Sequence, residues 1–209
     1  MSRIYLIRHG ECAGNREGLF RGRSDFPLNQ EGLRQAREVG AALGRVGLRA
    51  VYTSPLRRAS QTAEAIVAAA GLGEAQPLEA MNNISLGLWE GQPKQRIAEL
   101  YPLQWRCWLE TPETLRLEGG ESIEDVRRRA GLALTALAER HVDETVALVS
   151  HRAVIKCLLA EVLGLHLPWF WKLHLDNCGY SVVERTAGGW TLFHHNVVGH
   201  LSAFLSERR

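Results

Sequence analysis

The chain has 209 residues, of which 45% are hydrophobic and 23% charged, and its formal net charge is +2. That length suits a single domain over residues 1–209 with a full hydrophobic core. The balance of 25 basic and 23 acidic residues gives no overall bias toward nucleic acid or a membrane surface. No apolar run approaches the roughly 20 residues that cross a bilayer, so we expect neither nucleic acid nor membrane as a partner.

The first predicted element is a short buried strand over residues 4–7, whose sequence Ile-Tyr-Leu-Ile is rich in β-formers. It runs directly into Arg8, His9 and Gly10. Burying the first two in an apolar layer costs on the order of several kcal/mol, so we place them where the strand leaves the sheet. Gly10 allows a sharp turn and the close approach of a ligand. In open α/β sheets, ligands bind at this carboxyl end of the strands.

Turn-forming residues dominate residues 11–28, which we expect to form a loop that carries Arg21 and Arg23. Ser54 is then expected to cap a helix whose first residue is Pro55. The elements predicted after the loop are a helix over 29–47, a strand over 50–53 and this helix over 54–71.

The second half of the chain continues the alternation of strands and helices. Ser122 and Asp125 resemble a capping pair at the start of a long helix. A second strongly apolar strand runs into Ser150, His151 and Arg152. The predicted elements are helices over 93–101, 122–140 and 153–163, a strand over 144–149 and a hairpin over 180–194.

Alternating strands and helices predict an α/β fold, a three-layer α/β/α sandwich with a mostly parallel central sheet. Three strands end in polar residues: one at Arg8 and His9, one at Ser54 leading to Arg58, and one at His151. Because the carboxyl ends of parallel strands lie on one edge of a sheet, we expect these side chains to converge.

Two histidines and two arginines at one edge suit phosphoryl chemistry. The guanidinium group presents a planar fork that matches phosphate oxygens, and a histidine can attack phosphorus as a nucleophile. The second histidine, if protonated, stabilises charge on the transferred group. The helix N-termini near Ser54 and Arg152 add N–H groups toward an anion. Phosphoryl transfer depends mainly on such positioning and charge stabilisation.

The four cysteines are widely spaced and form no CxxC pair: Cys12, Cys107, Cys157 and Cys178. This spacing argues against a metal site and for reduced thiols in a cytoplasmic protein. The first strand begins directly at the N-terminus, so we expect no signal peptide. We expect no cofactor either.

At this point the sequence resembles the histidine phosphatase superfamily, the branch that contains phosphoglycerate mutases and small-molecule phosphatases. The resemblance covers nearly the whole chain and is carried by an ordered set of motifs: Arg8-His9-Gly10-Glu11 with Asn15, Arg21-Gly22, Ser54-Pro55-Leu56-Arg57-Arg58-Ala59, Leu86-Gly87-Leu88-Trp89-Glu90-Gly91, Gly119-Gly120-Glu121-Ser122 and Val149-Ser150-His151.

The resemblance implies a phosphoglycerate mutase-like fold and a small phosphorylated metabolite as substrate. It also implies that His9 becomes phosphorylated and that Arg8, Arg58 and His151 hold the phosphoryl group. In the same way, it implies that Asn15, Arg21 and Gly22 border the substrate.

One position departs from the family pattern. Members usually carry a glutamate six residues before the tryptophan of the Trp-Glu-Gly motif, as general acid for the leaving oxygen, and here that place holds Asn83. An amide donates hydrogen bonds but has no proton to release, and losing a general acid costs about 10²–10⁴ in rate. Three explanations stay open: Glu90 or Glu11 replaces the acid, water protonates a good leaving group, or the chain binds phosphates and turns over slowly.

Arg21 stands where many relatives have glutamine. With Arg23 it makes the mouth of the site more basic, which favours a substrate with a carboxylate or a second phosphate, although two solvated loop arginines explain the pair equally well. The tryptophans could cap the pocket, form a dimer contact or pack in the core. We favour core packing, and a homodimer stays open. The cluster comprises Trp105, Trp108, Trp169 and Trp171.

Three functions are therefore carried forward. The first is a phosphomonoesterase that hydrolyses a small metabolite through a phosphohistidine. The second is a phosphoglycerate mutase, which a bisphosphoglycerate requirement would reveal, although the middle region is short for that branch. The third, motivated by Asn83, is a weakly active or non-catalytic binder of phosphorylated ligands.

Overall fold

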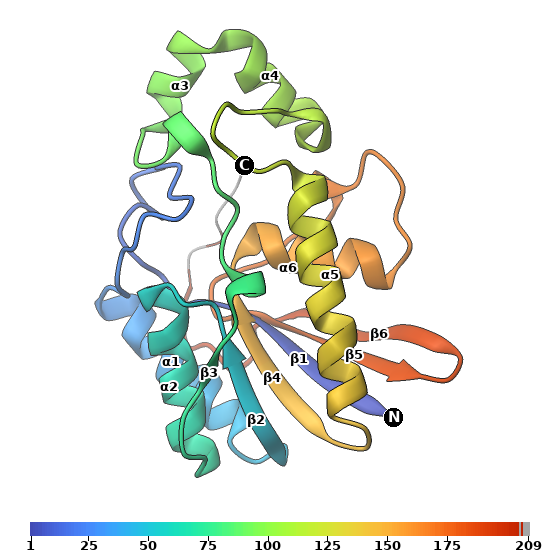
Figure 1. Cartoon of the computed structure of the whole chain (residues 1–209). Helices are drawn as coiled ribbons and strands as arrows, with labels where there is room; N and C mark the ends of the chain where they lie inside the picture. Colours follow the sequence, from blue (N-terminus) through green and yellow to red (C-terminus); the bar gives the residue numbers. More distant parts are fainter. Residues whose placement is uncertain (205, 207–209) are drawn as a thin grey trace.

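Six strands form one sheet in the order β3-β2-β4-β1-β5-β6 in the computed structural model, which describes residues 1–204 and 206 (Figure 1). The first four strands of this order are parallel, and β5 runs antiparallel to both of its neighbours, β1 and β6. The predicted mostly parallel sheet is confirmed. The strands are β1 (Ser2–Arg8), β2 (Leu48–Thr53), β3 (Gln76–Pro77), β4 (Thr145–Ser150), β5 (Tyr180–Thr186) and β6 (Gly189–Val197).

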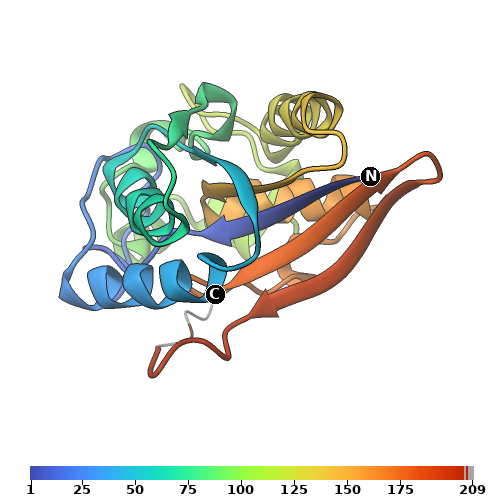
Figure 2. The same cartoon turned by 90° about the horizontal axis from the view of Figure 1, so that it is seen from below.

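Helices cover both faces of the sheet, as the three-layer prediction requires (Figures 1 and 2). One pair packs on one face and a second pair on the other, while two short helices lie beyond the carboxyl ends of the strands. The face pairs are α1 (Gln30–Leu43) with α2 (Arg57–Ala70) and α5 (Ile123–Arg140) with α6 (Arg152–Val162), and the short helices are α3 (Lys94–Leu100) and α4 (Pro102–Glu110).

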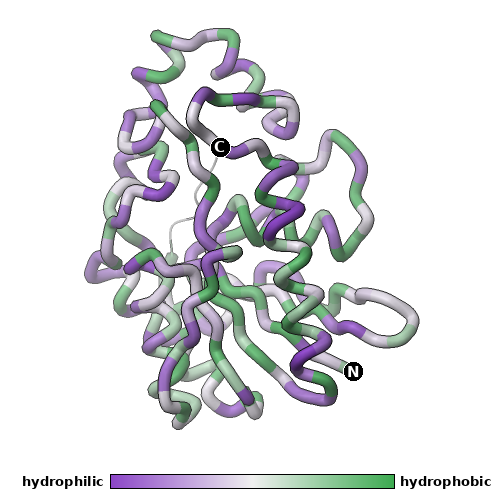
Figure 3. Tube along the Cα trace, viewed as in Figure 1, coloured by the Kyte–Doolittle hydropathy of each residue, from purple (hydrophilic) through white to green (hydrophobic). Residues whose placement is uncertain are grey.

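Strand residues alternate between two hydrophobic clusters, because successive side chains of a strand point to opposite faces. In β1, Leu6 packs with the α5 and α6 layer and Ile7 with the α1 and α2 layer. In β4, Leu148 and Val149 divide in the same way. Figure 3 shows hydrophobic residues gathered in the central strands. This burial on both faces holds the strand ends rigidly at one edge.

Two helix boundaries differ from the predictions, one at Ser54-Pro55 and one at Gly47. The helix predicted from Ser54 begins at Arg57, and its N-cap is Leu56, whose side chain makes no capping hydrogen bond. The helix expected to close at Gly47 already ends at Leu43. The capping pair of Ser122 and Asp125 is confirmed, since each side chain bonds the backbone of the other residue.

The structure shows a second reason for a glycine at position 10. A Cβ at this position would lie 2.7 Å from the carbonyl oxygen of Gly32 in α1. The backbone after β1 therefore passes against the first turn of α1, and a side chain here would separate the two. The close approach that the structure shows is to helix α1.

None of the helices in the described part of the chain has the length and apolarity that a bilayer crossing requires.

Candidate active site

The strand register places two histidines side by side. Arg8 is paired with Ser150 across the parallel strands β1 and β4, and His9 and His151 are the next residues along each strand. Their ring centroids lie 5.2 Å apart with the ring planes tilted by 59°. Both side chains are almost completely buried. The convergence predicted for these strand ends is present.

The tautomer of His9 is set by the backbone. Its Nδ1 lies 2.7 Å from the carbonyl oxygen of Gly10, and because a carbonyl only accepts, Nδ1 carries the proton. Nε2 therefore keeps its lone pair. Burial lowers the pKa of His9 well below its usual value, and the charges of Arg58 and Arg8 lower it further. The ring is neutral at pH 7 and presents a nucleophilic nitrogen.

His151 is neutral as well, in contrast to the protonated ring that the sequence suggested. Burial lowers its pKa well below the usual value, with further contributions from Arg58 and His9. Its Nε2 lies 2.7 Å from the hydroxyl oxygen of Ser54. Ser54 follows β2, and β2 is the other neighbour of β4 in the sheet. The second histidine is therefore a neutral ring with one N–H to donate.

Two buried guanidinium groups supply the positive charge at these strand ends. Arg8 donates from Nη1 to the carbonyl oxygen of Leu175 at 2.7 Å. Arg58, in the first turn of α2, donates to the carbonyl oxygens of Ser24 and Gly22 at 2.7 and 2.9 Å. Burial lowers the pKa of Arg58 to about 10, so the group stays charged at neutral pH. Carbonyl partners fix both groups without neutralising them.

Asn15 lies next to the histidine backbone rather than in the pocket lining. Its Oδ1 accepts from the backbone N–H of Cys12 at 3.0 Å, and its Nδ2 lies 3.5 Å from Oδ1 of Asn177. Asn177 in turn donates to the carbonyl oxygen of His9 at 2.9 Å. The structure thus connects Asn15 to the backbone that orients His9.

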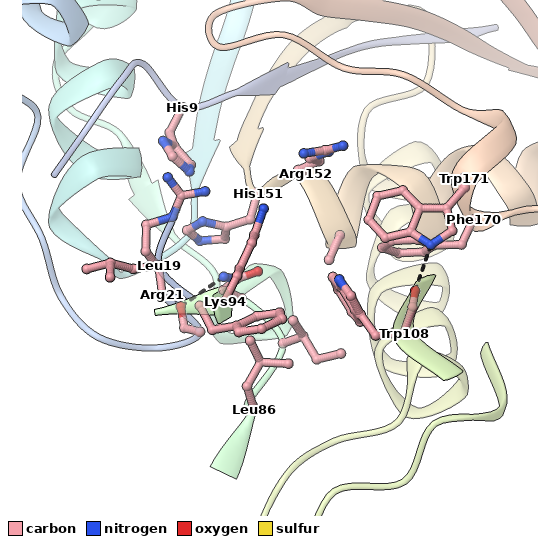
Figure 4. A pocket seen from close by; sticks show the side chains of 15 residues that line it. His9, Leu19, Arg21, Leu86, Lys94, Trp108, His151, Arg152, Phe170 and Trp171 are labelled. Atoms are coloured by element: carbon pink, nitrogen blue, oxygen red, sulfur yellow. Dashed lines mark hydrogen bonds between the residues drawn. The ribbon is translucent and has the colours of Figure 1, made fainter. Parts of the chain in front are cut away.

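Arg21, Gly22 and Asn83 line a pocket together with both histidines (Figure 4). The side chain of Asn83 donates to the carbonyl oxygen of Gly22 at 2.8 Å. Gly22 has a positive φ of 48°, and a Cβ there would lie 2.5 Å from the carboxyl group of Glu90. Arg21 and Gly22, which the resemblance places beside the substrate, therefore line the cavity beside His9, and so does Asn83, which stands where the family usually has the acid glutamate.

Residues 4–198 match the family model described as histidine phosphatase superfamily (branch 1). The chain belongs to the histidine phosphatase superfamily.

Relatives in this superfamily match the chain over nearly its whole length. It is 32% identical over 207 residues to phosphoserine phosphatase 1 of Hydrogenobacter thermophilus, covering 99% of this chain and 98% of that protein. It is 34% identical over 212 residues to a probable phosphoglycerate mutase, GpmB, of Klebsiella pneumoniae, covering 97% and 96%. The solved structure of Bacillus stearothermophilus YhfR matches with a TM-score of 0.91 at 30% identity, covering 96% and 99%. The protein is a phosphatase of this superfamily.

This histidine phosphatase has further pocket residues that the motifs did not reveal. Figure 4 shows Lys94 ending near Arg21 and His151, with Arg152 and the aromatic side chains on another side of the pocket. The guanidinium carbon of Arg152 lies 5.4 Å from the ring centroid of Trp171. Sequence reasoning did not name Lys94 or Phe170. It named Trp108 and Trp171 but favoured core packing over a place at the pocket, and it named Arg152 only at a helix N-terminus. Arg152 adjoins His151 in sequence, which is a signal that could have found it.

The aromatic wall of the pocket, formed by Trp108, Phe170 and Trp171, is fixed by hydrogen bonds to the backbone. The carboxylate of Glu113 accepts from the backbone N–H groups of Trp169 and Phe170 at 2.7 and 2.8 Å. The indole N–H of Trp171 donates to the carbonyl oxygen of Trp108 at 2.8 Å. Trp169 is buried, whereas Trp108 and Trp171 face the pocket. The cluster therefore serves both the core and the cavity.

The described pocket lining of the phosphatase contains no aspartate or glutamate. Glu90 accepts from the backbone N–H of Leu86 at 2.9 Å, and Glu11 accepts from Arg16 and Asn29 at 2.7 and 2.8 Å on the α1 side. Both carboxylates that were considered as substitutes for the acid thus have structural partners.

Arg23 does not belong to the pocket lining either, contrary to the basic mouth considered from sequence. It pairs with Glu121 at 3.1 Å and donates to the carbonyl oxygen of Asn83 at 3.1 Å. Arg21 is the loop arginine that reaches the cavity.

Proposed function

We propose that the protein hydrolyses a small phosphomonoester through a phosphohistidine on His9. Nε2 of His9 attacks phosphorus, the P–O bond to the alcohol breaks, and its electron pair stays on the leaving oxygen. Water then attacks the phosphohistidine, the P–N bond breaks, and the electron pair returns to Nε2. Inorganic phosphate leaves with the proton that the water loses.

One observation carries this proposal: a neutral His9 whose Nδ1 is bonded to the Gly10 carbonyl, next to two charged guanidinium groups. The lone pair on Nε2 is then available without a base to remove a proton. Arg8 and Arg58 supply fixed positive charge where the equatorial oxygens gain negative charge. His151 adds a neutral donor 5.2 Å from His9, measured between ring centroids.

The substrate class follows from the rest of the pocket. Arg21, Lys94 and Arg152 bring three further basic side chains to a cavity with an aromatic wall. We infer a compact phosphomonoester with a second anionic group, such as a carboxylate, close to the ester oxygen. A relative with 32% identity is named a phosphoserine phosphatase, and phosphoserine has this chemistry.

The asparagine at position 83 bears on how the leaving oxygen obtains its proton. The described lining offers no carboxylic acid, so we infer that the leaving oxygen takes its proton from water and that turnover is slow for alcohols of high pKa. The protein is then a phosphatase with a preference for good leaving groups. The alternative function, that of a phosphoglycerate mutase, is supported by the relative that is named a probable phosphoglycerate mutase.

The test is a panel of phosphorylated compounds assayed for phosphate release, with His9→Ala as the background. The panel contains phosphoserine, 3-phosphoglycerate, a sugar phosphate and p-nitrophenyl phosphate. We expect release from p-nitrophenyl phosphate and, among the metabolites, from those with a carboxylate. Isomerisation of phosphoglycerate that requires 2,3-bisphosphoglycerate would establish the mutase instead. Phosphate release no faster than in His9→Ala, together with measurable binding of phosphoserine, would establish a non-catalytic binder.

A further inference from the structure

Ser54 is buried at the point where three strand ends meet. Its backbone N–H donates to the carbonyl oxygen of Val149 in β4 at 2.9 Å, and its side chain is fully inaccessible to solvent. The sequence indicated a helix cap, but α2 begins three residues later, at Arg57. The hydroxyl group points instead to His151, with Oγ 2.7 Å from Nε2.

The direction of this hydrogen bond follows from counting protons. A hydroxyl group has one proton to donate and two lone pairs that accept. One lone pair of Oγ receives the backbone N–H of Leu56 at 3.4 Å. Among the described residues, Nε2 of His151 is the acceptor within reach of the hydroxyl proton. If Nε2 donated instead, the buried hydroxyl proton would have no acceptor, which is unfavourable.

His151 lines the pocket beside His9, and Nδ1 is the ring nitrogen that does not contact Ser54. Nδ1 is buried and has no hydrogen-bond partner in the described part of the protein. When Ser54 donates to Nε2, Nδ1 carries the proton of the neutral ring. The ring centroids of His151 and His9 lie 5.2 Å apart. A phosphoryl oxygen bound beside His9 is the partner that this N–H lacks.

We propose that Ser54 is a positioning residue that holds His151 in the Nδ1–H tautomer and thereby directs a neutral N–H donor at the transferred phosphoryl group. The inference rests on the proposed function only in identifying the phosphoryl group as the acceptor. The low pKa of His151, caused by burial and by Arg58, agrees with a neutral ring. The positive charge at the phosphoryl group then comes from the guanidinium groups, while Ser54 controls where the imidazole proton lies.

The tautomer can be observed directly by long-range ¹H–¹⁵N correlation spectra of protein with ¹⁵N-labelled histidine. The His151 signals are assigned from their loss in His151→Gln. We expect a protonated Nδ1 and an unprotonated Nε2 at pH 7.5 in the wild-type protein. Ser54→Ala should move the ring to the Nε2–H form or to a mixture, while Ser54→Thr, which keeps a hydroxyl group, should retain the wild-type pattern. A protonated Nε2 in the wild-type protein would overturn the proposal.

Kinetics provide the second readout. Outer partners of this kind change activity by about 10- to 100-fold, so Ser54→Ala should lower kcat for p-nitrophenyl phosphate by that factor. The affinity for vanadate should fall in parallel, with little change in KM. Ser60→Ala is the matched control, because Ser60 lies nearby in the first turn of α2 and, among the described residues, its hydroxyl donates to the carbonyl oxygen of Arg57 and not to a histidine. Thermal unfolding checks that each variant is folded.

The two proposals fail separately. A wild-type protein that does not release phosphate from any ester overturns the proposed function, yet the spectra still report the tautomer. A wild-type protein that hydrolyses the esters, with an unchanged tautomer and kcat in folded Ser54→Ala, overturns the role of Ser54 alone.

Discussion

His9 and His151 follow directly after Arg8 and Ser150, which are paired in adjacent parallel strands, and their ring centroids lie 5.2 Å apart. The pair is therefore positioned by the register of two central strands, β1 and β4, which are largely buried, and not by a loop. Groups on such a scaffold need little reorganisation when a phosphoryl group binds between them.

Replacing the nucleophile should abolish the reaction. We expect His9→Ala to lower kcat by about 10³-fold or more, because no other lone pair takes its place. Incubation of the wild-type protein with substrate and rapid acid-free quenching should trap a phosphorylated, acid-labile protein, and His9→Ala should not be labelled. Retention of turnover in the variant would exclude His9 as the nucleophile.

Binding of the phosphoryl group by Arg58 should depend on the planar shape of the guanidinium group and not only on its charge. Arg58 is buried and bonded to the carbonyl oxygens of Ser24 and Gly22. Lysine keeps the charge but loses the fork, so Arg58→Lys should lower kcat by about 10²-fold. Arg57→Lys, one residue earlier and exposed, is the control and should retain wild-type kcat.

The pH profile should reflect a nucleophile that is already neutral. Burial and the nearby arginines lower the pKa of His9, so protonation begins to inhibit only below the usual value of about 6.5. After correction for ionisation of the substrate phosphate, we expect kcat/KM to stay level from pH 8 to pH 6.5 and its acidic limb to lie below that. An acidic limb centred above pH 7 would contradict the burial argument.

The same two histidines should make the folded state less stable in mild acid. Their folded-state pKa values are lowered, so below about pH 6.5 the unfolded chain binds protons that the folded chain does not. The free energy of unfolding then decreases with falling pH by up to about 1.4 kcal/mol per pH unit for each histidine, until the folded-state pKa is reached. Urea unfolding between pH 7 and 5, compared with a His9→Gln/His151→Gln variant, isolates this contribution.

Restoring an acid at position 83 should change which leaving groups react. For phosphoserine, whose leaving alkoxide needs a proton, Asn83→Glu should raise kcat by about 10²-fold. For p-nitrophenyl phosphate, whose leaving group is stable as an anion, the change should be small. Gln95→Glu adds a carboxylate on the exposed face of α3 and should alter neither rate. Equal gains for both substrates would show that protonation is not the missing step.

Lys94 should select for the second anion of the substrate. A charge-assisted hydrogen bond contributes about 1.5–3 kcal/mol, so Lys94→Ala should raise KM for phosphoserine by roughly 10- to 100-fold. KM for p-nitrophenyl phosphate, which lacks a carboxylate, should change little. Lys172 is exposed and lies outside this pocket, so Lys172→Ala is the matched control. Similar KM changes for both substrates would place Lys94 at the phosphoryl group instead.

The sequence was sufficient for the sheet and for the residues at its edge, because β1 and β4 are apolar runs that end abruptly in charged motifs. It was insufficient for Ser54, since Ser-Pro is typical of a helix start and the bond to His151 joins residues 97 positions apart. The protonation state of His151 was also wrong, because burial is a property of the fold.

The same limit explains why the aromatic and basic side of the pocket could not be placed from sequence. Lys94 and Trp171 come from segments with no strand-end pattern, yet both line the pocket. The contact between the Arg152 guanidinium and Trp171 is likewise set by packing. Local periodicity contains no information about such pairs.

The carbonyl oxygen of Gly22 accepts from both Arg58 and Asn83, at 2.9 and 2.8 Å. Arg58, proposed to bind the transferred group, and Asn83, at the position of the family acid, therefore share one hydrogen-bond acceptor in the loop after β1. A change on either side moves this atom for the other, so substitutions at the two positions are coupled and their effects do not simply multiply.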